Sequence, residues 1–287
     1  MDKLYILGAG TPTPTPTRFG SAYVLDIDNE KIMFDCGPAT THKLVKAGLW
    51  PTEIDNIFFT HHHFDHDIDY PCFLLCRWDQ SIGKENQLKV FGPTLTEKIT
   101  EGIIGKDGLF SHDWKARVYH PVSQKVYENR GGTLPRKPPS VKARDVSEGL
   151  VYTSNTWEVT SANAEHVQPY LDSLAYRLET KSGKSIIFTG DTQPCDSVTN
   201  LAYDADIMLS MCWDDQDIMN KSGENIGQTG TIEAGKMAQK AGVKKLILVH
   251  MGPNISKHGP LEKGLGDIRE VYSGEVIYAE ELNSIDI

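Results

Sequence analysis

The sequence predicts an α/β fold of four layers, with two β-sheets at the centre and helices outside them. Two observations lead to this prediction. Apolar strand-like runs followed by helical spacing occur twice along the chain of 287 residues, a pattern typical of layered α/β domains. In addition, clusters of histidine and aspartate directly follow apolar strands, at positions where loops often carry functional side chains. We expect a single domain over residues 1–287, since some large architectures fill this length alone.

The first third of the chain alternates between strand and helix signals. The turn Asp28-Asn29-Glu30 separates two apolar runs, which is a hairpin signal. Helical spacing after residue 39 ends on Gly48 with Pro51 just beyond, which is a common way for a helix to end. The expected strands are residues 3–8, 21–27, 31–34, 54–60 and 88–92, and the expected helices are residues 39–48 and 94–105.

Residues 106–149 interrupt this alternation. They contain Gly131-Gly132 and the proline-rich run 135–139, and their periodicity is weak, so we expect an irregular insert. Strand and helix signals return immediately afterwards. The expected strands are residues 150–153, 157–162, 173–179, 185–189, 207–211, 245–250 and 275–279, and the expected helices are residues 232–241 and 261–271.

Composition restricts the classes of function. The net charge is −10, from 29 basic and 39 acidic residues, so the field of the whole molecule does not attract nucleic acid, although a local basic patch remains possible. No apolar stretch approaches the roughly 20 residues that span a bilayer, and the amino terminus lacks the pattern of a signal peptide. Five scattered cysteines suit a reducing compartment. These features predict a cytoplasmic protein without a membrane partner.

One histidine cluster indicates a metal site. His61, His63, Asp65 and His66 form the spacing His-x-His-x-Asp-His directly after an apolar strand. Imidazole and carboxylate groups are ligands that zinc, iron and manganese accept. The alternative interpretation is a polar surface loop that binds metal only by accident.

Three residues far along the chain share this placement at the end of a strand. They are His166, Asp191 and His250, each of which lies where an apolar run meets a loop. A single histidine in such a place is usually a packed or surface residue, and Gly-Asp is a common turn. Their common position therefore carries more weight than any one of them.

These motifs together resemble those of metallo-β-lactamase-fold hydrolases, and most closely the branch of ribonuclease Z-like and arylsulfatase-like enzymes. The resemblance covers roughly residues 3 to 280 and implies an αββα sandwich with two mixed sheets and outer helices. The motifs occur in the order of that family: Leu7-Gly8-Ala9-Gly10-Thr11-Pro12, Phe34-Asp35-Cys36-Gly37-Pro38, His61 to His66, His166, Gly190-Asp191-Thr192 and His250.

The resemblance also implies the ligand set. His61, His63 and His166 would hold one ion, Asp65, His66 and His250 would hold a second, and Asp191 would bridge them. We expect two divalent ions per chain, zinc first, with manganese or iron as alternatives, and we assign catalytic roles to Asp65 and Asp191. Two such ions about 3.5–4 Å apart can share a water, lower its pKa and present hydroxide to an ester. A homodimer is also expected.

The chain departs from ribonuclease Z-like enzymes at two features. Those enzymes carry an additional glutamate and histidine that serve as an acid pair, and here Met211 and Gln228 stand at the matching positions. They also use an arm to hold transfer RNA, whereas only 25 positions separate His166 from Asp191 here. We therefore expect a small-molecule ester-like substrate (a phosphodiester, sulfate ester, carboxylic ester or lactone), with nucleic acid unlikely. The alternatives are a ribonuclease Z-like tRNA 3′ endonuclease and a non-catalytic metal-containing binding or sensor protein.

Four residues near the motifs are candidate substrate contacts. Trp213 has a ring that can stack on a flat substrate, although core packing explains it equally well. Asp214, Gln228 and His258 offer hydrogen bonds. For Asp214 and His258 the alternative interpretation is a solvated loop residue.

Overall fold

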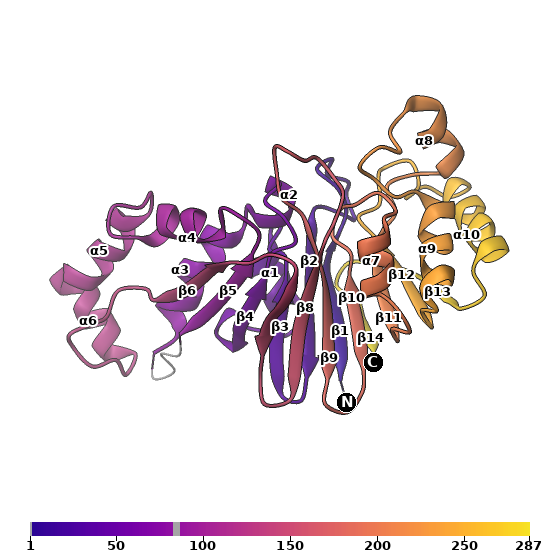
Figure 1. The fold of residues 1–287 in the computed structure, drawn as a ribbon. Coiled ribbons are helices and arrows are strands. Elements are labelled where there is room, and N and C mark those ends of the chain that lie inside the picture. The colour runs from indigo at the N-terminus through magenta and orange to yellow at the C-terminus, as the bar shows by residue number, and fades with distance from the viewer. Residues whose placement is uncertain (1, 83–86) are drawn as a thin grey trace.

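Two β-sheets lie face to face with helices on their outer sides, which confirms the predicted αββα sandwich with two mixed sheets (Figure 1). The computed structural model describes residues 2–82 and 87–287. In the first sheet the order of strands is β14-β1-β2-β3-β4-β5-β6. These strands are β1 (Lys3–Ala9), β2 (Ser21–Ile27), β3 (Glu30–Phe34), β4 (Ile54–Phe58), β5 (Leu88–Gly92), β6 (Val141–Asp145) and β14 (Ser284–Asp286).

The second sheet repeats the same plan. Its order is β13-β12-β11-β10-β9-β8-β7, and in both sheets one side is antiparallel and the other side parallel. The carboxyl ends of parallel strands meet at one edge of a sheet, so loops at that edge can converge. The strands are β7 (Gly149–Thr153), β8 (Trp157–Asn163), β9 (Leu174–Thr180), β10 (Ser185–Phe188), β11 (Ile207–Met211), β12 (Lys245–Val249) and β13 (Glu275–Tyr278).

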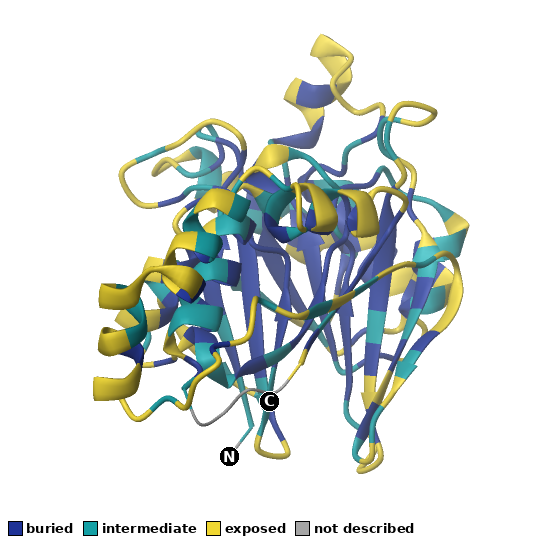
Figure 2. Ribbon diagram, turned by 90° about the vertical axis from the view of Figure 1, so that its left-hand side faces the viewer, coloured by how far each residue is buried: buried dark blue, intermediate teal, exposed yellow. Residues whose placement is uncertain are grey.

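The helices cover the outer face of each sheet and expose their own outer sides (Figure 2). On the first sheet they are α1 (Thr40–Lys46), α2 (Phe64–Asp67), α3 (Tyr70–Gln80), α4 (Thr96–Ile104), α5 (Ser111–Tyr119) and α6 (Pro121–Asn129), with a 3₁₀ turn at Pro51–Glu53. On the second sheet they are α7 (Asp196–Leu201), α9 (Thr231–Ala241) and α10 (Pro260–Val271), while α8 (Gln216–Ser222) projects above the sandwich (Figure 1). Among the described residues no helix is long and apolar enough to cross a membrane.

Aromatic side chains join the two sheets at the centre of the sandwich. The rings of Phe34 and Phe188 stack with centroids 3.7 Å apart, and Phe58 meets the edge of Tyr176 at 5.6 Å. All four residues are buried. Alternate residues of a strand point to opposite faces, so these side chains fill the space between the sheets. Their packing fixes the position of one sheet, and of its carboxyl edge, relative to the other.

The prediction of an irregular insert at residues 106–149 is wrong. This segment forms α5, α6 and the strand β6, which adds to the edge of the first sheet beside β5. Only Trp114 and Val118 of α5 and Tyr127 of α6 are buried, so the apolar periodicity of these helices is too sparse to recognise. The short elements α7, α8 and β14 were not predicted either, because six, seven and three residues are too few to show a period.

Candidate metal centre

The seven predicted ligands lie together in loops at the carboxyl edges of the two sheets. His61 and His63 follow β4, and Asp65 and His66 lie in α2, directly after them. His166, Asp191 and His250 follow β8, β10 and β12 of the second sheet. The site therefore depends on the packing of one sheet against the other.

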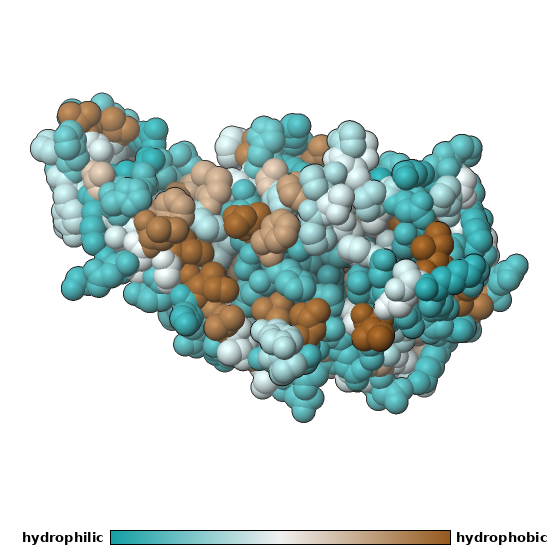
Figure 3. Space-filling model, turned by 90° about the horizontal axis from the view of Figure 1, so that it is seen from above, coloured by the Kyte–Doolittle hydropathy of each residue, from teal (hydrophilic) through white to brown (hydrophobic). Residues whose placement is uncertain are grey.

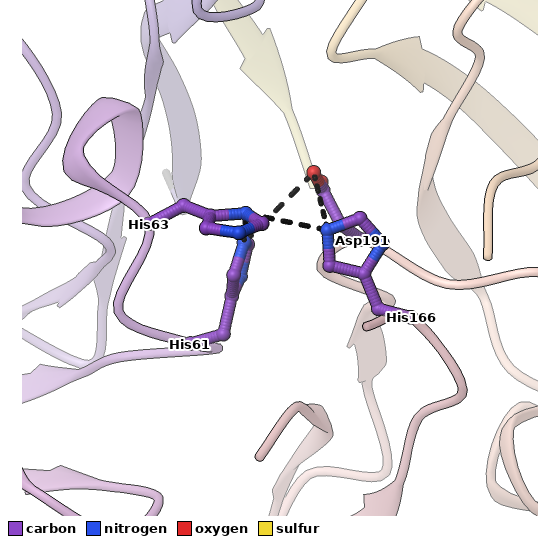
Figure 4. Close-up of side chains that lie close together, drawn as sticks. All are labelled: His61, His63, His166 and Asp191. Atoms are coloured by element: carbon purple, nitrogen blue, oxygen red, sulfur yellow. Dashed lines mark hydrogen bonds and ion pairs between the residues drawn. The ribbon is translucent and has the colours of Figure 1, made fainter. Parts of the chain in front are cut away.

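The first group of side chains comprises His61, His63, His166 and Asp191, which point toward one another from both sheets (Figure 4). The Nδ1 atom of His63 is 3.0 Å from Nε2 of His61 and 3.3 Å from Nε2 of His166. The Oδ2 atom of Asp191 is 3.9 Å from Nε2 of His61 and 3.8 Å from Nε2 of His166. These four atoms surround one small space.

The second group comprises Asp65, His66 and His250. The Oδ2 atom of Asp65 is 3.6 Å from Nε2 of His66 and 3.2 Å from Nε2 of His250. Asp191 also reaches this group, because its Oδ1 is 3.5 Å from His66 Nε2 and its Oδ2 is 3.1 Å from His250 Nε2. Asp191 is thus the carboxylate that both groups share.

The chemistry of these donors fits divalent cations. Within each group the candidate ligand atoms all lie within 4.8 Å of one another. Asp65 Oδ1, His66 Nε2 and Asp191 Oδ1 are buried without a hydrogen-bond partner among the described residues. Buried polar atoms without partners are costly, and a bound cation would satisfy them. Imidazole nitrogens and carboxylates in these numbers match the ligands of zinc.

Asp35 and Thr60 orient two of the imidazoles from behind. Asp35 Oδ2 accepts a hydrogen bond from His66 Nδ1 at 2.7 Å and one from the Thr60 hydroxyl at 2.9 Å. The same hydroxyl lies 3.1 Å from His61 Nδ1, and Asp35 Oδ1 accepts from the Thr60 amide at 2.7 Å. With Nδ1 engaged in this way, each ring presents Nε2 to the metal centre. Asp35 belongs to the motif Phe34-Asp35-Cys36-Gly37-Pro38 but was not among the predicted site residues.

His166 is oriented by the main chain. Its Nδ1 donates to the carbonyl oxygen of Gly227 at 2.7 Å, which leaves Nε2 for the metal centre. Gly227 has φ of +76°, and a Cβ atom there would lie 2.3 Å from the carbonyl oxygen of His166. Only glycine therefore fits at this position.

The surroundings set the charge of the donors. Burial, and next the neighbouring His66, hold the pKa of His61 well below its usual value. Burial opposes ionisation of Asp191, but the imidazoles of His250 and His66 outweigh it and hold the pKa of Asp191 well below its usual range. Burial likewise opposes protonation of His66, but Asp191 and Asp35 raise its pKa well above the usual value. A neutral His61 and an ionised Asp191 are the forms that bind a cation.

The predicted substrate contacts divide into two kinds. Trp213 lies beside the centre, its ring stacked on His250 with centroids 5.9 Å apart, and Gln228 follows the Gly227 that holds His166. Asp214 is engaged by main chain and by a neighbouring loop, since its Oδ1 accepts from the amide of Asp215 at 2.7 Å and from Asn254 Nδ2 at 2.9 Å. His258 does not join the centre: its side chain is 94% exposed and pairs with Glu262.

Met211 and His62 complete the surroundings. The buried sulfur of Met211 accepts the amide of Thr192, next to Asp191, at 3.1 Å, so no ionisable group stands at that position. The ring of His62 turns away from the ligands, with Nε2 2.8 Å from the hydroxyl of Thr96. His62 therefore supports α4 and lies outside the ligand set.

Comparison with known families agrees with this geometry. The family model described as "Beta-lactamase superfamily domain" matches residues 110–251, and the model "Anti-Pycsar protein Apyc1" matches residues 2–68. The two matched segments together hold all seven candidate ligands.

Relatives of known name match nearly the whole chain. Ribonuclease BN of Proteus mirabilis is 28% identical over 290 residues, which cover 91% of each chain. Ribonuclease Z of Listeria monocytogenes is 29% identical over 289 residues, which cover 91% of this chain and 92% of the relative. Two crystal structures share the fold at 22% identity. The metallo-β-lactamase fold protein YhfI from Bacillus subtilis has a TM-score of 0.73 and covers 99% of this chain and 98% of its own. Human tRNase Z, short form, has a TM-score of 0.70 and covers 100% and 99%.

These relatives overturn two predictions. A small-molecule substrate was expected and nucleic acid was considered unlikely, whereas the relatives of known name are ribonucleases Z and BN. The error had a physical cause: net charge averages over the whole surface, and the loss of an acid pair affects the rate of a step, not the identity of the substrate. The predicted metal-dependent hydrolase is confirmed. The predicted resemblance to metallo-β-lactamase-fold hydrolases, and within them to the ribonuclease Z-like branch, is therefore confirmed.

Proposed function

We propose that this protein is a ribonuclease Z-like endonuclease that hydrolyses a phosphodiester bond of RNA at the 3′ side of transfer-RNA precursors. The observation that carries the proposal is the pair of ligand groups that share Asp191, a donor set suited to phosphodiester hydrolysis. Ribonucleases Z and BN that align over about nine tenths of the chain support it.

The proposed cofactor is two zinc ions per chain. His61, His63, His166 and Asp191 would hold one ion, and Asp65, His66, His250 and Asp191 would hold the other. When bound, such a pair of divalent ions supplies Lewis acidity that activates water and offsets the charge developing on a phosphate. The rings need no reorientation to bind, because Asp35 and the carbonyl of Gly227 already hold His66 and His166 in place.

Other side chains of the chain shape the reaction. Asp65 and Asp191 bring negative charge to a buried site. Because both carboxylates would hold metal ions, we expect water rather than a side chain to act as the nucleophile. Trp213 covers His250 on one side and offers an aromatic face on which a base can stack. Since Met211 cannot donate a proton, the departing ribose oxygen takes its proton from elsewhere, and we expect cleavage to be slower than with an acid in that position.

The direct test is cleavage of a transfer-RNA precursor with a 3′ trailer. Protein purified without chelator should release the trailer, EDTA should abolish cleavage, and zinc should restore it. Asp191→Ala, which removes the carboxylate shared by both groups, should reduce the rate at least on the order of 10³-fold, consistent with the loss of a charge-stabilising group. Zinc-loaded protein that cleaves a cyclic nucleotide but leaves the RNA intact would refute the proposed function.

We further propose that the protein is a cytoplasmic homodimer. The face seen from above is mostly hydrophilic with separate hydrophobic patches (Figure 3). Phe64 and Ile68, one helical turn apart at α2, are 51% and 55% exposed. Exposed apolar pairs of this kind favour contact with another surface. The five free cysteines support a reducing compartment. Light scattering measures the molar mass in solution: wild type should have the mass of a dimer, and the double variant Phe64→Ser with Ile68→Ser should have the mass of a monomer.

A further inference from the structure

The charge of this protein is unevenly distributed along its chain. Residues 106–149 contain nine lysines and arginines against five aspartates and glutamates, so this segment carries a net charge of +4. The rest of the chain therefore has a net charge of −14, and the two parts add up to the total of −10. Phosphate recognition depends on local positive charge rather than on net charge, and this segment is where it is concentrated.

Folding gathers part of this charge around one carboxylate. Asp79, at the end of α3, pairs with Arg136 at 2.9 Å, Arg130 at 3.2 Å and Arg117 at 3.4 Å. One carboxylate cannot neutralise three guanidinium groups. Arg117 also pairs with Asp113 at 2.9 Å, so three arginines and two aspartates leave a surplus of positive charge.

The members of this basic cluster have different exposure. Arg136 is buried between the rings of Trp78 and Tyr127, 4.1 and 4.8 Å from their centroids, and it holds the carboxylate in place. Arg117 and Arg130, by contrast, are 45% and 50% exposed. Their remaining N–H groups face solvent and are available to an anion.

A neighbouring lysine extends the same surface. The carbonyl oxygen of Lys137 accepts a hydrogen bond from Trp78 Nε1 at 3.0 Å, which places Lys137 beside the cluster. Its side chain is exposed and has no ion-pair partner among residues 2–82 and 87–287. The basic cluster thus consists of Arg117, Arg130, Arg136 and Lys137.

Helix α3 connects the ligand loop to the basic cluster, which lies at the far end of this helix. Helix α3 begins at Tyr70, four residues after His66, and Asp79 lies nine residues further on, about 14 Å along the helix axis. A strand in a nucleic-acid duplex carries one phosphate per about 3.4 Å, so roughly four base steps cover this length. Helices α5 and α6 lie beyond β6 at the outer end of the first sheet (Figure 1).

From these observations we infer that the basic cluster binds the phosphate backbone of the RNA substrate several nucleotides away from the scissile bond. The inference rests on the proposed function. Guanidinium groups bind phosphate with paired hydrogen bonds, and contacts to the backbone fix the position of a nucleic acid without reading its sequence. The cluster would thus supply the holding surface that the short segment between His166 and Asp191 has no room to form.

The test compares two double variants of the zinc-loaded enzyme. Arg117→Ala with Arg130→Ala removes two exposed charges from the cluster, and Lys236→Ala with Lys240→Ala removes two ion-paired, exposed charges from α9. We measure kcat and KM for the transfer-RNA precursor over a range of salt concentration. At 0.1 M salt the arginine variant should lose on the order of tenfold in kcat/KM per lost contact, through KM, and its plot of log kcat/KM against log salt should be flatter by about two. The lysine variant should match wild type.

Hydrolysis of bis-p-nitrophenyl phosphate, which is too small to reach the cluster, reports the state of the metal centre in each variant. If wild type cleaves the RNA and the arginine variant has the same KM and salt slope as wild type, this inference alone is overturned. A parallel loss of diester hydrolysis in the arginine variant also overturns it, since the arginines would then act through the fold. Wild type that does not cleave or bind the RNA overturns the proposed function, and this inference with it.

Discussion

At the scale of single residues, Asp35 shows how much of the metal centre is built by side chains that touch no ion. Its two carboxylate oxygens accept hydrogen bonds from the amide and hydroxyl of Thr60 and from the ring of His66. Its φ of +57° is unusual for a residue with a side chain. Strain of this kind persists where the surroundings enforce it, here to place a carboxylate behind His66.

Asp35→Asn should therefore weaken metal binding without preventing folding. Asparagine has one acceptor oxygen where aspartate has two, so either Thr60 or His66 loses its partner. Loss of such an orienting group typically costs 10–100-fold in metal affinity, which zinc titration against a competing chelator measures. Asp206→Asn is the matched control, because Asp206 also accepts an amide and a hydroxyl but at the opposite end of β10. Equal zinc affinity in both variants would contradict the role of Asp35.

At the scale of elements, the loops that follow the strands place the ligands, and their glycines decide how closely they approach. Gly227 and Gly223 both have φ near +80°, +76° and +79° respectively. A Cβ at Gly227 would collide with the carbonyl of His166, whereas a Cβ at Gly223 meets nothing within 4 Å. The two positions therefore separate backbone strain from displacement of a ligand.

Gly223→Ala should cost about 1–2 kcal/mol in the free energy of unfolding, from its left-handed backbone alone, and should keep full metal content. Gly227→Ala should cost at least as much and should also lose metal from the group that contains His166, because His166 must move away from the added methyl. Urea unfolding and elemental analysis give the two quantities. Full zinc content in Gly227→Ala would show that the loop tolerates the shift and that this glycine does not position His166.

At the scale of the whole molecule, the metal centre joins the two sheets. His61, His63, Asp65 and His66 belong to the first sheet, whereas His166, Asp191 and His250 belong to the second. An ion bound by both groups acts as a link between the halves of the sandwich. We also propose that the 287 residues unfold as one domain, since the same aromatic core contacts both sheets.

Removal of metal should therefore lower the thermal stability of the entire protein. An ion present at 100 times its dissociation constant adds about 2.7 kcal/mol to the free energy of unfolding, which corresponds to about 4–5 °C in Tm for a chain of this size. Calorimetry should show a single unfolding transition both with and without EDTA, and EDTA should move this transition to a lower temperature. Asp191→Ala, which loses the shared ligand, should shift far less. Two separate transitions would contradict the single domain, and an unchanged Tm would contradict the link between the sheets.

The sequence by itself determined the layered architecture and the seven candidate ligands. Apolar strands of period two and helices with a broad apolar face leave a clear local pattern in the sequence. The candidate ligands stand directly after such strands, as His61 and Asp191 do, so the same pattern identifies them. Helices α5 and α6 escaped prediction because so few of their residues are buried.

Only the tertiary structure decided which distant side chains meet. Asp35 reaches His66 across 31 positions of the chain, and Asp79 collects Arg130 and Arg136 across 51 and 57 positions. No local period records such contacts, because they depend on how helices and sheets pack after they form. For the same reason net charge is a poor guide to nucleic-acid binding: a sum over the chain has no position, whereas a phosphate responds to the few charges that the fold places within a Debye length of about 8–10 Å.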